Sequence, residues 1–215
     1  MPYDARRNAD ATKIRYLVDS TADQPFQGDT SSGLNHVQTE AAIDAAMSEW
    51  QAQRCLRGVP IVKRSVPDGT DPDLLDYFFF GNGHPPSQVQ LFQADIIHGG
   101  WLPLSAIFGR GVLAITFTIY FVQDGRPTDI NGDGYADTVW TETYYNDDYA
   151  WGIDVVSGAI DVQTVALHES GHALGLGHFG PPPAAVMNPS YGGLKQAPLP
   201  TDNAGLCAVW ASWPH

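Results

Sequence analysis

Cysteine, basic residues and long hydrophobic runs are all scarce in this sequence. Its 215 residues include two cysteines, and 11 lysines and arginines stand against 24 aspartates and glutamates, for a formal net charge of −13. Phosphate binding relies on lysine and arginine, so this balance argues against a nucleic-acid partner. The longest apolar run, 112–122, is interrupted by threonines and falls short of the roughly 18 residues that a membrane span needs. We therefore expect no membrane span.

Internal repeats, low-complexity tracts and a hydrophobic leader are also missing from the pattern. Residues 1–7 are not followed by a hydrophobic segment, so we expect no signal peptide in this chain. An apolar fraction of 43% with 16% charged residues argues against disorder. The length suits one domain with a sizeable core.

What the sequence does contain is an H-E-x-x-H-x-x-G-x-x-H pattern. His168 and His172 stand four residues apart, so on a helix they share one face and can reach one metal ion at ~2.0–2.1 Å. His178 can join them only if the helix ends first. Gly175 is where we expect that end, because glycine takes the positive φ that reverses a chain. Three histidines leave the fourth position of a tetrahedral zinc ion open, which is typical of a catalytic site.

Glu169 lies beside the first histidine and is predicted to act as general base and then general acid. The pattern thus favours a zinc-dependent hydrolase of peptide bonds. Two alternatives stay open: a zinc- and calcium-containing binding or adhesion module without catalysis, and a zinc hydrolase of a non-peptide bond. The intact Glu169 argues against the first alternative, and the motif alone leaves the second one open.

The hydrophobic pattern along the chain predicts alternating strands and helices. Residues 112–122 are long and β-branched, which favours a central strand. Residues 138–145 alternate between polar and apolar types, which favours an edge strand. If this edge forms the upper rim of a cleft, an extended peptide can pair with it. The other expected elements are strands at 13–18, 59–66 and 89–97, a helix at about 37–56, loops over 67–88 and a motif helix capped by Asp161.

Residues 185–191, with the sequence AVMNPSY, follow the zinc motif closely. Together the two stretches resemble the metzincin zinc metallopeptidases, and the Met-x-Pro-x-Tyr spacing is closest to the matrixin (matrix-metalloproteinase-like) family, in its secreted, bacterial-type form. The resemblance implies that Met187 lies beneath the zinc as an apolar floor and is not a ligand. It also implies that Pro189 and Tyr191 wall the pocket for the substrate residue just after the cut.

The same resemblance implies the fold and the partners. We expect an α+β, zincin-like fold: a twisted mixed sheet, mostly parallel with an antiparallel edge, two long helices, and a small lower lobe with the Met-turn and a terminal helix. A single catalytic domain would span 1–215, with an upper lobe at about 12–175 and a lower lobe at 176–215. The expected partners are protein or peptide substrates of an extracellular, monomeric enzyme. Phe179 and Asn188 depart from the usual matrixin residues, which leaves the subfamily open.

An Asp-rich loop predicts a second metal. Asp129, Asn131, Asp133, the Tyr135 carbonyl and Asp137 match ligand positions of an EF-hand loop, although a tryptophan replaces the bidentate glutamate. Closely spaced oxygen ligands repel one another unless a cation lies among them. We predict a structural calcium ion with no part in the chemistry. The alternative is an ordinary turn with solvated charges.

The two cysteines, Cys55 and Cys207, are predicted to form a disulfide. An even cysteine count in an extracellular setting favours pairing. The bond would tie the end of the early helix to the last helix. The alternative is two buried free thiols.

Overall fold

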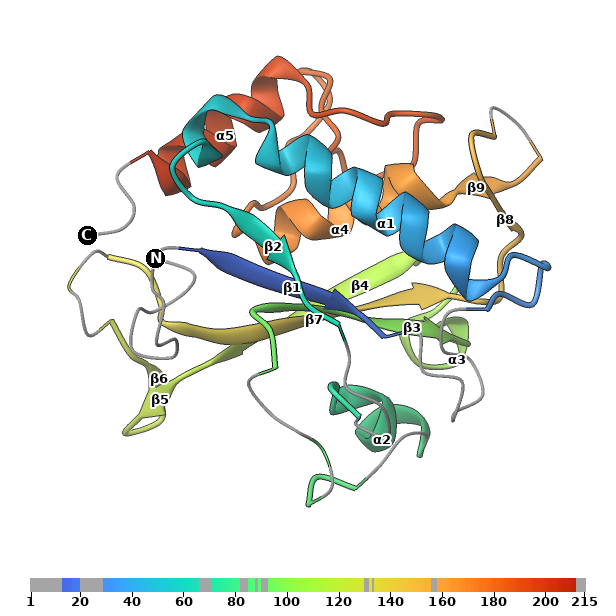
Figure 1. Ribbon diagram of the computed structural model, residues 1–215, viewed down its shortest axis with the longest axis horizontal. Coiled ribbons are helices and arrows are strands. Elements are labelled where there is room, and N and C mark those ends of the chain that lie inside the picture. The colour runs from blue at the N-terminus through green and yellow to red at the C-terminus, as the bar shows by residue number, and fades with distance from the viewer. Residues whose placement is uncertain are drawn as a thin grey trace.

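A twisted five-stranded sheet forms the centre of the fold, in the order β2-β1-β3-β7-β4 (Figure 1). Neighbouring strands are parallel except at β4, which runs antiparallel to β7 and forms one edge. The computed structural model describes residues 13–19, 29–65, 71–81, 85–87, 89, 93–129, 132, 134–155 and 158–211. The strands of the sheet are β1 (Ile14–Val18), β2 (Ile61–Lys63), β3 (Ile96–Leu102), β4 (Ala114–Tyr120) and β7 (Thr138–Asn146).

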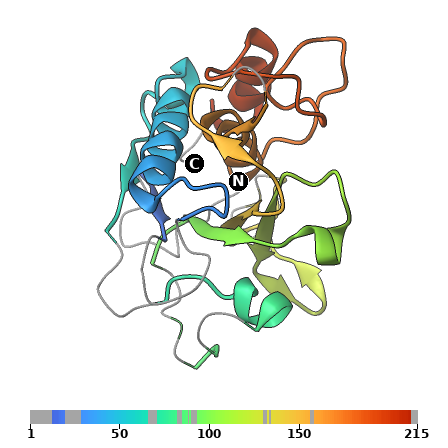
Figure 2. The ribbon, with the colours of Figure 1, turned by 90° about the vertical axis from the view of Figure 1, so that its right-hand side faces the viewer.

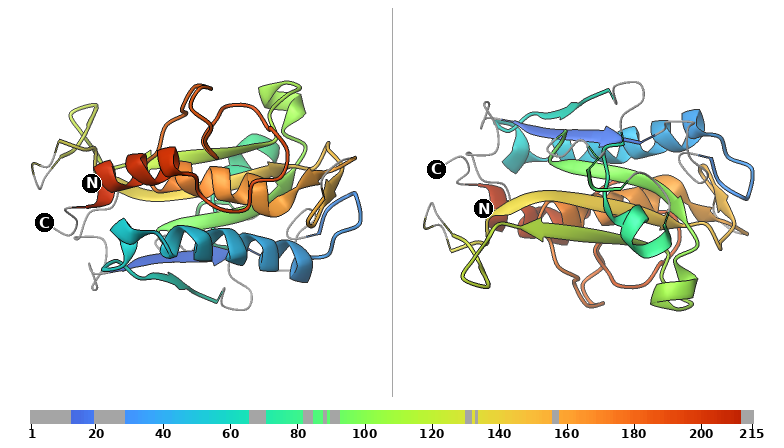
Figure 3. Two further views of the ribbon diagram at one scale, coloured as in Figure 1. Left: turned by 90° about the horizontal axis from the view of Figure 1, so that it is seen from above. Right: turned by 90° about the horizontal axis from the view of Figure 1, so that it is seen from below.

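Helices cover both faces of the sheet unequally. The three longest, α1 (His36–Gln51), α4 (Val162–Ala173) and α5 (Pro200–Trp210), lie on one side, and α2 (Leu75–Phe80) lies on the other (Figure 2). Seen from above, α1 and α4 run side by side along the sheet (Figure 3). The short elements are η2 (Arg54–Leu56), α3 (Ser105–Phe108), β5 (Val122–Gln123), β6 (Arg126–Pro127), β8 (Trp151–Gly152) and β9 (Ile160–Asp161).

The sequence of helix α1 explains its start, its buried face and its contact with α4. Asn35 and Gln38 form a capping box, each side chain accepting from the other residue's backbone N–H, which satisfies two donors of the first turn. Residues at helical spacing then form its buried face, and among them Trp50 is fully buried. The indole Nε1 of Trp50 donates to the carbonyl of Leu167 at 2.9 Å. Helix α1 therefore fixes the middle of α4.

The architecture confirms the predicted α+β class, the mostly parallel sheet and the antiparallel edge. The prediction of which strand is the edge was wrong. Strand β7 (138–146) is internal and buried along its whole length, and β4, within the stretch expected to be central, is the partly exposed edge. The polar side chains of β7 suggested an exposed edge strand, but they are buried and find hydrogen-bond partners inside the protein. Thr143, for example, contacts Thr116 of β4 through their hydroxyl oxygens at 2.9 Å.

Two further boundaries differ from the predictions. The strand expected at 89–97 is β3, which starts at Ile96 and continues through Gly99 and Gly100 to Leu102. A Cβ atom on Gly99 would come within 2.5 Å of the Tyr144 ring, so a glycine lets the strand continue there. The strand expected at 59–66 is shorter in the structure, where only β2 forms. Within the predicted loop region, residues 75–80 form α2.

A disulfide joins Cys55 in η2 to Cys207 in α5, with 5.2 Å between their Cα atoms. It links segments 152 residues apart in sequence and closes the end of the helical layer. Among the residues described, none of the helices has the length and hydrophobicity needed to span a membrane.

Candidate metal centre

Helix α4 begins and ends where its sequence dictates. Asp161 caps the start, its Oδ1 accepting from the Thr164 backbone N–H at 2.7 Å. At the other end Gly175 adopts φ +89°, and its N–H donates to the carbonyl of His172. The N–H of the next residue, Leu176, donates to Gly171, which completes a Schellman motif. The predicted break at Gly175 is confirmed, and the reversed chain returns toward the helix.

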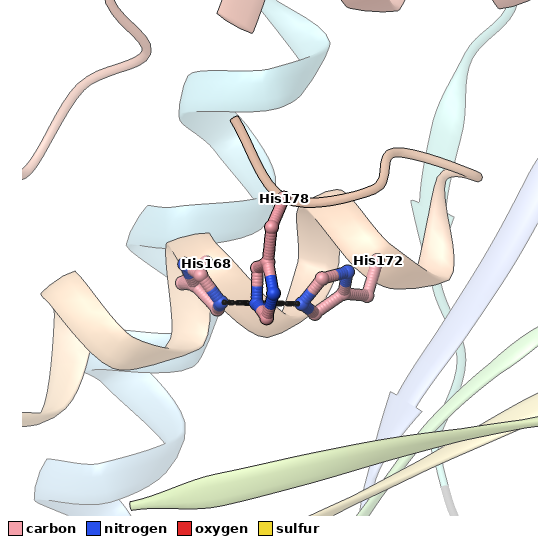
Figure 4. A group of neighbouring side chains, drawn as sticks. All are labelled: His168, His172 and His178. Atoms are coloured by element: carbon pink, nitrogen blue, oxygen red, sulfur yellow. Dashed lines mark hydrogen bonds between the residues drawn. The ribbon is translucent and has the colours of Figure 1, made fainter. Parts of the chain in front are cut away.

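The reversal brings three imidazoles together. The Nε2 atoms of His168, His172 and His178 lie 3.1–3.2 Å from one another (Figure 4). A tetrahedral zinc ion with bonds of 2.0–2.1 Å separates its nitrogen ligands by ~3.3–3.4 Å. The triangle of nitrogens therefore fits one zinc ion with little adjustment.

Hydrogen bonds on the far side of two rings fix their tautomers. Nδ1 of His168 lies 2.8 Å from the Val186 carbonyl oxygen, and Nδ1 of His172 lies 2.8 Å from that of Leu176. A carbonyl oxygen only accepts, so each Nδ1 carries the proton and each Nε2 presents a lone pair. Burial lowers the pKa of His168 to about 4 and also lowers that of His172, so both rings are neutral. Converging lone pairs are the donor set that a cation requires.

Met187 is fully buried under α4, at the level of Gly171 between the two helical histidines. A Cβ atom on Gly171 would come within 2.3 Å of the Met187 Sδ, so only a glycine allows this contact. The turn that carries Met187 is held from α5. The Asp202 carboxylate accepts the backbone N–H groups of Val186 at 2.8 Å and of Met187 at 3.0 Å.

Glu169 lies on the side of α4 that faces the sheet. Its Oε2 accepts a hydrogen bond of 2.7 Å from the Thr116 hydroxyl on β4. Burial raises the pKa of Glu169 from 4.5 to about 7, and the hydrogen bond from Thr116 opposes the shift. A carboxyl group with a pKa near 7 can both take up and release a proton at neutral pH.

A cavity of about 920 Å³ opens over the three histidines. Strand β4 contributes one wall, including Ala114 and Thr116, and Pro189 and Tyr191 line the cavity as well. The hydroxyl oxygen of Tyr191 accepts from the Asp161 backbone N–H at 3.2 Å, which fixes the ring against the start of α4. The structure thus brings the zinc motif, Glu169 and both predicted pocket residues to one cavity.

Known proteins are similar in sequence to the part of the chain that contains this site. A family model described as matrixin matches residues 108–209. Over that segment the chain is similar to the matrixins. Matrix metalloproteinase-25 of Mus musculus is 34% identical over 103 residues, which cover 42% of this chain and 17% of that protein. Metalloendoproteinase 1-MMP of Arabidopsis thaliana is 31% identical over 145 residues, which cover 67% of this chain and 30% of that protein.

Matrix metalloproteinase-25 of Homo sapiens is 35% identical over 89 residues, or 38% of this chain and 16% of that protein. The matrixin-like chain therefore spans less than a third of the length of each of these relatives. The segment that the matrixin model matches includes the whole zinc motif, the Met187 turn and Asp202.

Sequence reasoning missed two residues of this matrixin-like site. Thr116 belongs to no motif and is one of two threonines in the apolar stretch 112–122, but it pairs with Thr143 and contacts α4. Asp202 lies in the terminal helix, 24 residues after the last motif histidine, and the zinc motif itself gives it no role. An acidic residue in the first turn after Pro200 was the available signal, since such residues accept backbone N–H groups.

The predicted calcium loop is described only in part. Asp129 Oδ2 accepts from the Gly134 N–H at 3.0 Å, and Asp137 is buried, with its Oδ2 accepting from the Thr128 hydroxyl at 2.6 Å. Tyr135 is exposed. Asn131 and Asp133 lie outside the described residues, so the structure leaves this prediction untested.

Proposed function

We propose that this chain is a zinc-dependent endopeptidase in which His168, His172 and His178 hold the metal and Glu169 is the general base. The triangle of Nε2 atoms, with two tautomers fixed by backbone carbonyls, is the observation that carries the proposal. The matrixin family to which the segment is similar is a family of zinc peptidases, which supports the choice of metal.

Each residue of the site has its own role in the proposed reaction. When bound, zinc supplies a Lewis acid for the scissile carbonyl and lowers the pKa of water toward ~7. Glu169 takes the proton of the attacking water and returns it to the leaving amine. Thr116 is a positioning residue, because its hydroxyl restrains one carboxylate oxygen of Glu169 at 2.7 Å. Neutral His168 and His172 keep their lone pairs available.

The substrate proposed for this site is an extended peptide. Strand β4 is the edge of the sheet and one wall of the cavity, so its free backbone groups can pair with a peptide strand. This moves the rim from 138–145, where the sequence suggested it, to 114–120. Pro189 and Tyr191 line the cavity beside the histidines, which supports their proposed role as walls of the pocket after the cut.

Digestion of casein or gelatin with and without a chelator tests the function. We expect cleavage that the chelator abolishes and added zinc restores. Glu169→Ala should abolish hydrolysis at unchanged zinc content, and Glu49→Ala on α1 is the matched control that should keep both. Zinc binding without any hydrolysis by the parent chain would favour the binding module. Hydrolysis of an ester but no peptide would favour the non-peptide hydrolase.

We also propose that the chain acts outside the cell, as a monomer, with calcium in the loop 128–137. A disulfide is the kind of bond that persists in oxidising compartments, which supports the location. Light scattering tests the monomer, and detection of the protein in culture medium tests export.

For the loop, Asp133→Ala should lose one equivalent of calcium by elemental analysis. An unchanged calcium content would contradict the loop site.

A further inference from the structure

One lysine lies among the residues that line the cavity over the three histidines. Lys195 stands in the segment between α4 and α5, and it lines the cavity together with Tyr191 and Gly192. Of the described residues that line this cavity, Lys195 is the only lysine or arginine, and Glu169 is the only aspartate or glutamate. Because Glu169 is already assigned to the chemistry, Lys195 is a charge in the cavity that the proposed reaction does not use.

The backbone of Lys195 is fixed to the start of α4. Its N–H donates to the Thr164 hydroxyl oxygen at 3.0 Å, and that hydroxyl donates to Oδ1 of Asp161 at 2.7 Å. Thr164 precedes His168 by four residues, so the two side chains share one face of the helix, about 6 Å apart along its axis. Both of these residues line the cavity. Lys195 is therefore held about one helical turn from the histidine end of the same cavity.

The side chain of Lys195 folds back along the wall of the cavity. A Cβ atom on Gly192 would lie 3.2 Å from Nζ and 4.0 Å from Cε of this lysine. The ammonium group thus lies against the residue that directly follows Tyr191, the proposed wall of the pocket for the residue after the cut. Lys195 is partly buried, as expected for a lysine whose alkyl stem packs on protein while its ammonium group stays hydrated.

Lys195 forms no ion pair within the part of the chain that the structure describes. The ion pairs found there belong to other cations, on β1, α1 and β2. Two aspartates near the start of α4 have other donors: Asp161 accepts from Thr164, and Asp154 accepts from the Gln196 side chain at 2.7 Å. An ammonium group with no acidic partner at the wall of a substrate cavity can pair with a carboxylate of the substrate.

We propose that Lys195 is a specificity-determining residue, and that the peptides cut at this site carry an acidic side chain, above all glutamate, just after the scissile bond. This inference rests on the proposed peptidase function and names the class of peptide that it would cut. Val165 and Tyr191 also line the cavity, and their apolar groups suit the methylene groups of a glutamate. The carboxylate of that glutamate would then pair with the ammonium group of Lys195.

The overall charge of the protein makes this local cation informative. A formal net charge of −13 repels acidic peptides as a whole. A preference for an acidic residue at one position therefore requires a positive group close to that position. Moving one glutamate along a peptide changes the short-range contact and leaves the net charge of the peptide the same. Positional isomers of one peptide thus separate the local contact from the long-range repulsion.

The experiment compares two end-blocked peptides of identical composition with the zinc-loaded parent chain. One peptide has glutamate just after the scissile bond and glutamine two positions later, and the other has the two residues exchanged. Mass spectrometry of the products locates the cut. We expect the first peptide to be cleaved with about tenfold higher kcat/KM, because a hydrogen bond to a charged group is worth roughly this factor or more.

Variants at one position test whether Lys195 causes the preference. Lys195→Gln should abolish it, Lys195→Arg should keep most of it, and Lys195→Glu should transfer it to a peptide with lysine just after the cut. Arg57→Gln is the matched control, since it removes the same charge at an exposed residue beside η2, outside the lining of the cavity. This control should keep the preference of the parent. A preference that survives in Lys195→Gln would overturn the proposal.

Binding without cleavage separates this proposal from the proposed function. Fluorescently labelled forms of the two peptides are titrated into the zinc-loaded Glu169→Ala chain, and anisotropy gives each Kd. About tenfold tighter binding of the first peptide, lost when Lys195→Gln is added, would support the role of Lys195 even if the parent cleaved no peptide. Equal kcat/KM in a parent that cleaves both peptides would overturn the role of Lys195 and leave the peptidase function standing. Neither cleavage nor binding would overturn both.

Discussion

The hydroxyl of Thr116 on the edge strand donates to Oε2 of Glu169 on the zinc-motif helix at 2.7 Å. The same hydroxyl oxygen lies 2.9 Å from that of Thr143 on the neighbouring strand. Thr143 can thus donate to Thr116 while Thr116 donates to Glu169. The carboxylate is held by two strands of the sheet, outside the zinc motif itself.

Thr116→Val should lower kcat for peptide hydrolysis about tenfold, because a lost hydrogen bond to a charged group is worth ~1.5 kcal/mol or more. KM and zinc content should stay close to those of the parent. Thr116→Ser should restore most of the rate. Thr201→Val, on α5 and outside the lining of the cavity, is the control. An unchanged kcat in Thr116→Val would show that Glu169 needs no restraint from β4.

The raised pKa of Glu169 predicts how stability depends on pH in the metal-free chain. The folded carboxyl has a pKa of about 7 and its ordinary value is 4.5, so between these values the folded chain binds more protons than the unfolded chain. Stability from this group is fully present below pH 4.5 and is lost as the pH rises through 7. Glu169→Gln should therefore be more stable than the parent at pH 8, by on the order of 3 kcal/mol. The difference should vanish near pH 4.

Urea unfolding in the presence of a chelator, at pH 4, 6 and 8, measures this dependence. Bound zinc should reduce the difference, because a nearby positive charge lowers the pKa of a carboxyl group. A gap between Glu169→Gln and the parent that is the same at every pH would contradict the assignment of the titration to Glu169.

Gly171→Ala should destabilise the metal centre through Met187. The added Cβ would lie 2.3 Å from Sδ, and overpacking of a core typically costs ~1–3 kcal/mol, more than the ~1 kcal/mol that alanine gains over glycine in a helix. We expect lower stability in urea and weaker zinc binding in a competition assay. Gly177→Ala, where the new Cβ meets nothing within 4 Å, is the matched control. The double variant Gly171→Ala, Met187→Ala should recover part of the zinc affinity.

Removal of the disulfide should be costly because it joins distant segments. Cys55→Ser with Cys207→Ser opens a link across 152 residues, and for loops of 100 residues or more the chain-entropy treatment gives ~5 kcal/mol. Urea unfolding of the double variant measures the loss. Alkylation of the unreduced parent, followed by intact-mass analysis, should modify no thiol. Two alkylated thiols would show that the bond does not form in solution.

The parts of the site that the sequence predicted are those set by local geometry. The four-residue spacing of His168 and His172 and the positive φ of Gly175 depend only on helix dimensions and glycine stereochemistry. The Met187 turn came from a resemblance over a short segment. Each of these features lies within about 20 residues of chain, which is the range where sequence patterns are most informative.

The features that the sequence did not predict depend on distant segments. Strand β7 is internal because β4 pairs on its outer side, and its Glu142 is buried where the backbone N–H groups at the start of α2 donate to it. Its alternating polar residues look like those of an exposed edge until those partners are known. The carboxylates of Asp19 and Asp73 likewise come close together only because β1 and the segment before α2 are neighbours in the fold.

The hydrogen bonds of the Asp202 carboxylate affect when the zinc site can form during translation. It holds the backbone of Val186 and Met187, and the Val186 carbonyl in turn sets the tautomer of His168. Trp210, later still, donates to the Leu174 carbonyl at the end of α4. A ribosome that has translated all three histidines has thus not yet supplied the Val186 carbonyl that orients His168, nor the Asp202 carboxylate that holds Val186 in place. The nascent chain should therefore not hydrolyse neighbouring proteins until α5 has emerged from the exit tunnel and packed against α4.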